Sequence, residues 1–156
     1  MRRDGFRERG ITYLEVMITI TILLILAAAA MPVARTAIKR ERELELRSAL
    51  REMRNAIDLY KKYSDQGLIM PEGLETEGFP KELDALVEGV NQVGAIGKKL
   101  RFLRRIPKDP MTNTFEWGLR SLQDDPNSLS WGRQNVFDVY TTSEGVGLDG
   151  TPYNCW

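Results

Sequence analysis

The hydrophobic and polar positions divide the chain into one apolar stretch followed by a long mixed region. Residues 16–34 contain no charged side chain, and only Thr19 and Thr21 have polar side-chain atoms there. An α-helix of this length rises about 28 Å, which is close to the thickness of the hydrocarbon core of a bilayer. The stretch is therefore predicted to be a helix that spans a membrane.

From Val33 onward the apolar positions follow the pattern of an amphipathic helix. The apolar residues recur at spacings of four, three, four and three: Leu46, Leu50, Met53, Ile57 and Tyr60. The charged residues on the other faces, Glu43 and Arg54 among them, are predicted to form mainly a solvated surface. This pattern predicts one helix from Ile11 to about Ser64, with Gly67 as its C-terminal cap. Pro32 lacks an amide hydrogen and crowds the preceding turn, so we expect a kink or a loosened turn near Ala28.

The region after Gly67 begins with breaker residues. Residues 68–80 combine proline, glycine and glutamate and are predicted to form a loop. A short second helix is predicted from residue 81 to about residue 93, because its apolar residues lie along one side. Gly94 and Gly97 are expected to end this helix.

The second half of the chain predicts strands. Residues 107–110 form a rigid turn that contains two prolines. Alternating strands are predicted over residues 114–120 and 135–141, with a polar loop over residues 123–132 between them. Three residues of the first strand are expected to share one face: Phe115, Trp117 and Leu119. The fold class is therefore predicted to be α+β, with the long helix packed on a small antiparallel β-sheet and a C-terminal loop.

The composition removes several kinds of chemistry. The 22 basic and 22 acidic residues give a formal net charge of zero, which predicts no general attraction to polyanions. There is no histidine, the commonest general base, and the single cysteine, Cys155, cannot form a disulfide within the chain. The sequence also contains no glycine-rich phosphate loop and no cysteine near a base. The chain is therefore predicted not to be an enzyme.

One basic run, from Lys98 to Lys108, stands out in the second half. Cations with an interleaved aromatic residue, Phe102, can contact phosphates. The alternative is a solvated segment whose apolar residues, Leu100, Leu103 and Ile106, face inward. Runs of charged residues are usually solvated in this way. Nucleic acid is therefore not expected as a partner.

The N-terminal ten residues are rich in arginine and end at Gly10. A charged start before an apolar run is also typical of an ordinary signal peptide, cut after residues 28–30, or of a plain membrane anchor. Glu15 argues against the signal peptide, because a carboxylate at the membrane boundary is costly unless it meets a cation. The alternative for Glu15 is that its long side chain simply reaches the interface.

Two motifs resemble a known family. Gly10, a hydrophobic residue and then Glu15 before the apolar run resemble the class III signal of type IV pilins and pseudopilins, although Ile11 replaces the usual phenylalanine. Residues 107–113 and Phe137-Asp138-Val139-Tyr140 resemble the major (G-type) pseudopilin of type II secretion systems, with a Trp-Gly pair of that family replaced by Met-Thr. The resemblance covers about half of the chain and implies a pilin-like fold.

The resemblance implies a division of the chain into four parts. Residues 1–10 are a cleaved class III leader, and residues 11–34 are the transmembrane and filament-core helix. Residues 35–66 continue that helix in amphipathic form, and residues 67–156 form a soluble periplasmic head.

It also implies roles for four residues near the N-terminus. Prepilin peptidase cuts between Gly10 and Ile11, and Ile11 becomes the methylated N-terminus. Glu15 meets the N-terminal amine of a neighbouring subunit during assembly. Pro32 lies where the family often has a proline and where the helix unwinds locally in a filament.

The function implied by the resemblance is structural. The subunit is an inner-membrane protein with one span, its N-terminus cytoplasmic and its head periplasmic. It polymerises into a helical homo-oligomer, the periplasmic pseudopilus, which drives protein export. The implied partners are prepilin peptidase, an inner-membrane assembly platform with its ATPase, and minor pseudopilins.

Alternative functions stay open at this point. One is a type IV pilus pilin for adhesion or motility, although those commonly close their C-terminal loop with a disulfide that Cys155 alone cannot form. Another is a competence pseudopilin for DNA uptake, with the basic run as its contact. A plain membrane-anchored binding protein is the third.

Residues 142–152 contain candidate metal ligands. They are rich in glycine and in oxygen-bearing side chains, which calcium prefers. Because major pseudopilins bind calcium in the equivalent loop, the resemblance makes Ser143, Glu144 and Asp149 candidate calcium ligands. The alternative is that Asp149 and the following glycine form an ordinary turn. No other cofactor is expected.

Overall fold

The computed structural model describes residues 10–95 and 97–156, so the predicted leader lies outside the described residues except for Gly10. The chain divides into two compact units, Met1–Lys39 and Arg40–Trp156, and we call the second one the head unit.

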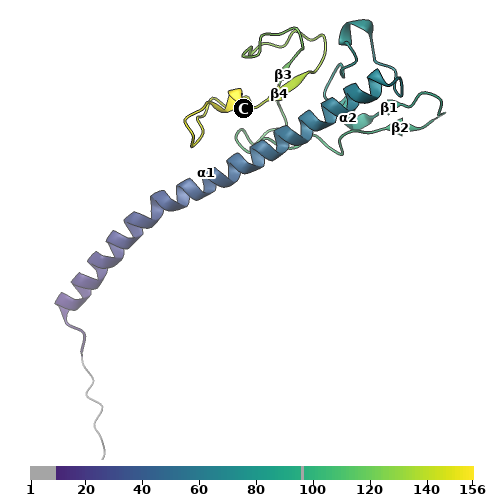
Figure 1. Cartoon of the computed structure of the whole chain (residues 1–156). Helices are drawn as coiled ribbons and strands as arrows, with labels where there is room; N and C mark the ends of the chain where they lie inside the picture. The colour runs from purple at the N-terminus through teal and green to yellow at the C-terminus, as the bar shows by residue number, and fades with distance from the viewer. Residues whose placement is uncertain (1–9, 96) are drawn as a thin grey trace, which may run out of the picture. The chain divides into compact units, whose positions relative to one another are not determined.

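One helix, α1 (Tyr13–Asp65), contributes to both units and is purple to blue in Figure 1. Its bounds agree with the predicted helix from Ile11 to about Ser64. Pro32 lies inside α1, which is helical on both sides of it, and the expected bend at this position stays a prediction.

The amphipathic part of α1 forms one side of the core of the head unit. The predicted stripe is buried at every position: Leu46, Leu50, Met53, Ile57 and Tyr60. These side chains belong to one cluster with residues from the rest of the head unit, including Ile69, Leu86, Leu103, Val136 and Val139. A large apolar side chain contributes about 1.5–3 kcal/mol when it is fully buried, so the stripe is a main source of stability for the head unit.

The C-terminal end of α1 is capped as predicted. Gly67 has a φ of 68°, a left-handed conformation that glycine adopts without strain. Its N–H donates to the Ser64 oxygen at 2.9 Å, and the Leu68 N–H donates to the Tyr63 oxygen at 3.0 Å. This pair of bonds is a Schellman motif, which satisfies carbonyl groups at the end of the helix.

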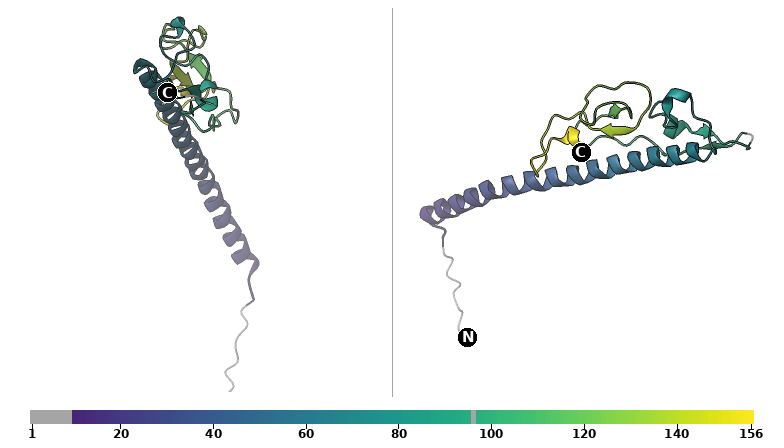
Figure 2. Two further views of the ribbon diagram at one scale, coloured as in Figure 1. Left: turned by 90° about the vertical axis from the view of Figure 1, so that its right-hand side faces the viewer. Right: turned by 45° about the horizontal axis from the view of Figure 1, so that its top comes forward.

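The strands of the head unit are short and form two separate antiparallel pairs. β1 (Val90–Asn91) pairs with β2 (Lys99–Leu100). β3 (Gly118–Arg120) pairs with β4 (Asp138–Tyr140), and Leu119 lies opposite Val139. Loops join these strands and cover one side of α1 in the head unit (Figure 2).

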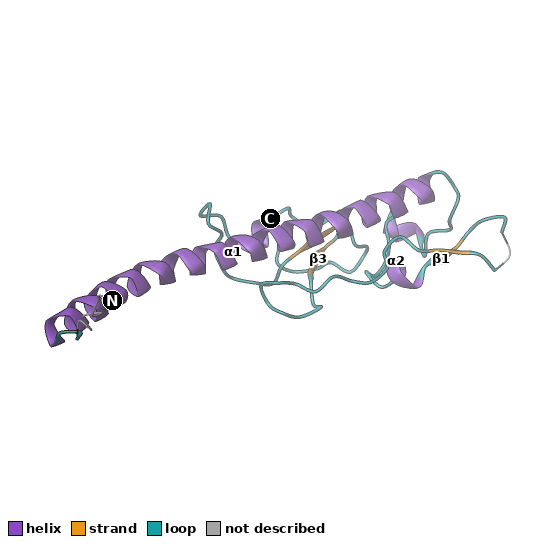
Figure 3. Ribbon diagram, turned by 90° about the horizontal axis from the view of Figure 1, so that it is seen from below, coloured by secondary structure: helices purple, strands orange, loops and turns teal. Residues whose placement is uncertain are grey.

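Three short helices complete the described fold. They are η1 (Leu74–Thr76), α2 (Ala85–Glu88) and η2 (Tyr153–Cys155). Figure 3 shows that most of the head unit outside α1 is loop. A long N-terminal helix with small antiparallel sheets confirms the predicted α+β, pilin-like fold.

The predicted helix over residues 81–93 is wrong in its length, because only α2 is α-helical there. The chain turns at Gly89, whose φ is 80° and where a Cβ would lie 2.7 Å from the main-chain oxygen of Leu100. Gly94 and Gly97 also have positive φ values, of 79° and 75°, in the connection between β1 and β2. These glycines were expected only to end a helix, but they make a hairpin.

The predicted strand over residues 114–120 is also too long. Asn113 has a φ of 61°, and the Asp109 N–H donates to the Thr114 oxygen at 2.8 Å, so the chain is still turning where the strand was expected to begin. Phe115 is 62% exposed whereas Trp117 is buried, so the expectation that they share a face is wrong.

The other predictions for the second half are closer. β4 lies inside the predicted strand over residues 135–141, and residues 123–132 form a loop. In the basic run, Leu103 is buried and Leu100 and Ile106 pack against the core. The solvated-segment interpretation of that run is therefore confirmed.

Candidate assembly site

The described side chains in the apolar part of α1 are exposed. No residue of its most apolar 18-residue window is buried, and by length and composition it is the one helix within the described ranges that could cross a membrane. Its two polar side chains are satisfied within the helix: the hydroxyls of Thr19 and Thr21 donate to the main-chain oxygens of Val16 and Met17 at 2.9 and 2.7 Å. The surface of this segment can therefore be covered by lipid or by other apolar helices without leaving either hydroxyl group unbonded.

Gly10 and Ile11 precede α1 and are exposed. A Cβ placed on Gly10 would meet no described atom within 4 Å, so the peptide bond between these two residues is not enclosed by the rest of the described chain. Both residues that the resemblance assigns to cleavage and methylation thus lie outside the helix.

Thr12 caps the start of α1, a feature that the sequence reasoning missed. Its side-chain oxygen accepts the Glu15 N–H at 3.3 Å, and its main-chain oxygen accepts the Val16 N–H at 3.2 Å. The signal was available, because threonine followed three residues later by glutamate is the capping-box pattern. Glu15 is exposed in the first turn of α1, where a carboxylate interacts favourably with the positive end of the helix dipole.

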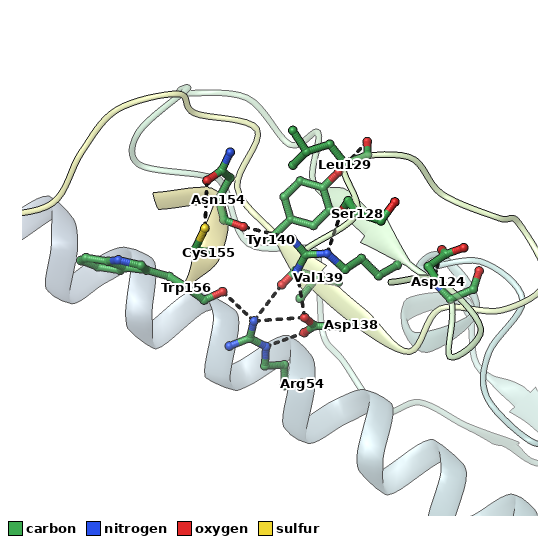
Figure 4. A network of polar contacts seen from close by, with 12 residues as sticks. Arg54, Asp124, Ser128, Leu129, Asp138, Val139, Tyr140, Asn154, Cys155 and Trp156 are labelled. Atoms are coloured by element: carbon green, nitrogen blue, oxygen red, sulfur yellow. Dashed lines mark hydrogen bonds and ion pairs between the residues drawn. The ribbon is translucent and has the colours of Figure 1, made fainter. Parts of the chain in front are cut away.

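A network of ion pairs joins α1 to β3 and β4 (Figure 4). Asp138 lies between two arginines: Arg54 Nε donates to its Oδ1 at 2.7 Å, and Arg120 Nη1 donates to its Oδ2 at 3.3 Å. Arg120 is buried, donates to two main-chain oxygens at 2.8 and 3.1 Å, and lies 4.1 Å from the centre of the Tyr140 ring. A buried guanidinium is tolerable only with such a complete set of partners.

Arg54 also holds the C-terminal segment, residues 142–156, against α1. Its Nη2 donates to the main-chain oxygens of Val139 and Trp156 at 3.1 and 2.7 Å (Figure 4). The sequence reasoning placed Arg54 on a solvated face, which is wrong. Its position next to Met53 of the buried stripe was the available signal, but its partners lie far away in the sequence.

Glu43 is another charged residue of α1 that the sequence reasoning assigned to the solvated surface, and its side chain is buried. Its Oε1 accepts the Leu148 N–H at 2.8 Å and the Tyr153 hydroxyl at 2.9 Å. Burial, together with the hydrogen bond and charge of Glu43, raises the pKa of Tyr153 to about 12. Glu43 therefore fixes the C-terminal segment at a second point along α1.

Asp109 explains the turn that resembles the major pseudopilin. It is fully buried, and its carboxylate accepts the Met111 N–H at 2.8 Å and the hydroxyl of Thr141, which follows β4. Trp117 Nε1 donates to the main-chain oxygen of Pro107 at 2.9 Å. This motif is therefore a structural joint between the turn and the sheet of β3 and β4.

Two of the three candidate calcium ligands, Ser143 and Asp149, make hydrogen bonds within the described structure. Asp149 is committed to other groups: Arg47 contacts its Oδ2 at 3.2 Å, and Thr151 donates to its Oδ1 through both its N–H and its hydroxyl. Ser143 accepts the Gly145 N–H, and Glu144 is exposed. The described residues contain no group of three acidic, cysteine or histidine side chains that could hold a metal ion. Calcium binding stays an untested prediction.

Comparisons with known proteins give one consistent result. Type II secretion system core protein G of Vibrio cholerae serotype O1 is 28% identical over 153 residues, covering 92% of this chain and 83% of that protein. The protein of the same name from Klebsiella pneumoniae is 26% identical, covering 94% of this chain and 89% of its own length. The one from Pectobacterium carotovorum is 25% identical, with coverages of 96% and 82%.

Other comparisons add nothing to this. No protein-family model matches the chain, and no solved structure matches it. The similarity to the core G proteins extends over nearly the whole chain, whereas the motifs noted in the sequence covered about half of it. The resemblance drawn from those motifs is confirmed: over most of its length the chain is similar to type II secretion system core protein G, the major pseudopilin.

Proposed function

We propose that this chain is the structural, non-enzymatic subunit of a type II secretion pseudopilus. The observation that carries the proposal is the contrast between the two parts of α1. One part is uncharged and has no buried side chain among its described residues, and the other completes the core of the head unit. Such a chain needs a cover for its apolar helix, first from lipid and then from other copies of itself. The names of the relatives point to secretion as the setting.

Processing by prepilin peptidase at Gly10 is the first step of the proposal. The arginine-rich leader stays on the cytoplasmic side, as the positive-inside rule expects, and the head unit is periplasmic. In cells that contain the peptidase, the mature chain should begin at Ile11 with a methylated amine, which mass spectrometry of the intact protein measures. A Gly10→Leu variant should keep the leader. Leader removal from that variant at the same rate as from the unchanged chain would contradict the assignment.

Assembly through the apolar helix is the second step. Ala27, Ala28 and Ala30 are small, so neighbouring helices can approach closely there. Glu15 is exposed at the start of α1 and can pair with the cationic N-terminal amine of the next subunit. Other partners of the proposal are the assembly platform, its ATPase and minor pseudopilins. Pro32 is where the packed helix would loosen.

Glu15 provides the sharpest test of this step. Glu15→Gln and Glu15→Ala should leave membrane insertion intact and strongly reduce the filament fraction sheared from cells. Glu41→Gln is the matched control, because Glu41 is also exposed on α1 but lies in the head unit. Normal filaments from Glu15→Ala would refute the proposed pairing.

The secretion setting is tested separately by deleting the gene in its host. Export of the proteins that the type II system releases should stop, and expression of the unchanged chain should restore it. If export continues while surface motility or DNA uptake is lost, the chain serves a pilus or a competence system instead.

A further inference from the structure

The head unit contains a groove of about 570 Å³ between α1 and the C-terminal segment. Its lining is both cationic and apolar: Arg47, Arg51, Leu44 and Trp156 contribute, and Cys155 lies at its side. All of these residues belong to the head unit, so the groove is part of one compact body.

The cations of the groove differ in how they are used. Arg47 pairs with Asp149 at 3.2 Å, and its guanidinium lies 4.1 Å from the centre of the Trp156 ring. Arg51 donates through Nε to the Arg47 main-chain oxygen at 3.2 Å, and its two other nitrogens make no hydrogen bond or ion pair within the described part of the chain. Leu44 beside them is exposed. The groove therefore offers an uncommitted positive charge next to an apolar wall.

A loop elsewhere on the head unit has the complementary character. Between Met70 and Glu77, which we call the acidic loop, three glutamates are exposed: Glu72, Glu75 and Glu77. Leu74 at its tip is 100% exposed, and Met70 is exposed as well. This loop thus presents negative charges around an apolar side chain that no other described residue covers.

The acidic loop is held in a fixed shape. Thr76 is fully buried and donates its hydroxyl to the Gly73 oxygen at 2.8 Å, which closes the single turn of η1. Glu77 has a φ of 52° and accepts a hydrogen bond from Gln123 at 2.9 Å. Little conformational freedom remains to be lost when Leu74 is covered, which favours binding by this loop.

We propose that the acidic loop of one copy docks into the arginine groove of the next copy, with Leu74 against Leu44 and Trp156 and with Glu75 facing Arg51. A chain cannot make this contact with itself. The groove centres on residues 47–51 of α1, whereas the acidic loop follows the end of α1, about 20 Å or more further along the helix axis. Figure 2 shows the C-terminal segment and the loop after α1 at different places along the helix.

The symmetry of the contact supports a second copy as the occupant. The acidic loop and the arginine groove are different surfaces of one chain, so each copy can dock its loop on one neighbour and receive the loop of another. A contact of this heterologous kind that does not close on itself produces an open helical filament. The inference rests on the proposed function and adds to it the head surfaces that set the axial stagger between neighbours.

Charge reversal tests the pairing in full-length chains expressed with the secretion machinery. Arg51→Glu and Glu75→Lys should each reduce the sheared filament fraction about tenfold, because like charges then face each other. The double variant should restore most of it. Arg105→Glu and Glu82→Lys are matched controls, because both residues are exposed and lie outside the groove and the loop. Equal assembly by the single variants and the controls would overturn the proposal.

Cross-linking provides a second readout that does not depend on assembly yield. The chain's single cysteine, Cys155, lies at the groove. A Leu74→Cys variant should therefore form a ladder of disulfide-linked chains in oxidised filaments, and Cys155→Ser should abolish it. Glu82→Cys should give no ladder. If Leu74→Cys filaments form without a ladder, the docking is refuted while the proposed function stands. If the unchanged chain forms no filaments at all, the proposed function itself fails.

Discussion

The Asp138→Asn substitution tests the account of the head unit most directly. Asp138 joins α1 to the sheet of β3 and β4 by pairing with both Arg54 and Arg120. Asparagine has nearly the same shape, so the substitution removes the charge without leaving a cavity. The buried Arg120 guanidinium then has no counter-charge within the described part of the head unit.

The expected magnitude follows from the exposure of the three side chains. Their exposed fractions are 8% for Arg120, 24% for Asp138 and 36% for Arg54, so one pair is nearly buried and the other is partly screened. Breaking a buried pair costs about 3–5 kcal/mol, and an exposed pair contributes about 0–1 kcal/mol. Arg120 keeps its two main-chain acceptors and asparagine keeps one oxygen, so we expect a loss of about 2–3 kcal/mol.

The assay is urea unfolding of a soluble chain starting at Arg40, since the head unit holds the whole core cluster. The midpoint should fall with little change in the slope of the free energy against urea. Asp65→Asn is the control, because its pair with Lys61 lies on the surface and should contribute no more than about 0.5 kcal/mol. A loss for Asp138→Asn no larger than that of the control would refute the reasoning.

Three further predictions concern the head unit. Gly118→Ala should cost about 1–3 kcal/mol, because its Cβ would lie 2.2 Å from the Tyr140 ring; adding Tyr140→Leu should remove much of this cost, and strictly additive losses would contradict the clash. Between pH 10 and 12 stability should fall by up to about 2–3 kcal/mol, because the unfolded tyrosine ionises near 10 while Tyr153 keeps its proton to about 12. The contribution of the Tyr153 hydroxyl to stability is fully present below pH 10. Tyr153→Phe should therefore flatten the dependence of stability on pH, and parallel curves for the variant and the unchanged chain would refute this prediction. Asp124→Ala should speed amide exchange in the polar loop, because the Asp124 carboxylate accepts main-chain N–H groups there, first that of Gly132, and these bonds lower its pKa. The contribution of Asp124 to stability is present above pH 3.8 and is lost as the pH falls through the lowered pKa. Unchanged exchange in the loop would show that Asp124 does not hold it.

The sequence was most informative where structure repeats along the chain. The stripe from Leu46 to Tyr60 follows the helical period, and every predicted position is buried. Gly67 was identifiable as a cap because only a left-handed residue ends a helix in this way. The apolar stretch needed only its length and the absence of charge. Each of these inferences depends on neighbours within one or two turns.

The head was less predictable because its order comes from distant partners. Arg54 stands next to Met53 of the buried stripe, but nothing near Arg54 or Glu43 in the sequence shows which groups they contact. Their roles depend on Asp138 and Tyr153, far along the chain. The missed hairpin of β1 and β2 has a different cause: its strands have two residues each, too few to show an alternating pattern.

The polar bonds between α1 and the C-terminal segment also determine how the head unit folds. The hydrogen bonds of Glu43 with Tyr153 and of Arg54 with Trp156 join residues 110 and 102 positions apart. Closing such long loops costs entropy before any contact repays it, and a high contact order slows folding. The apolar stripe of α1 therefore gains its complete cover only when the C-terminal segment packs against it. Until then one helix exposes two apolar surfaces, the N-terminal apolar stretch and the stripe from Leu46 to Tyr60, and folding of the head unit covers the second of them.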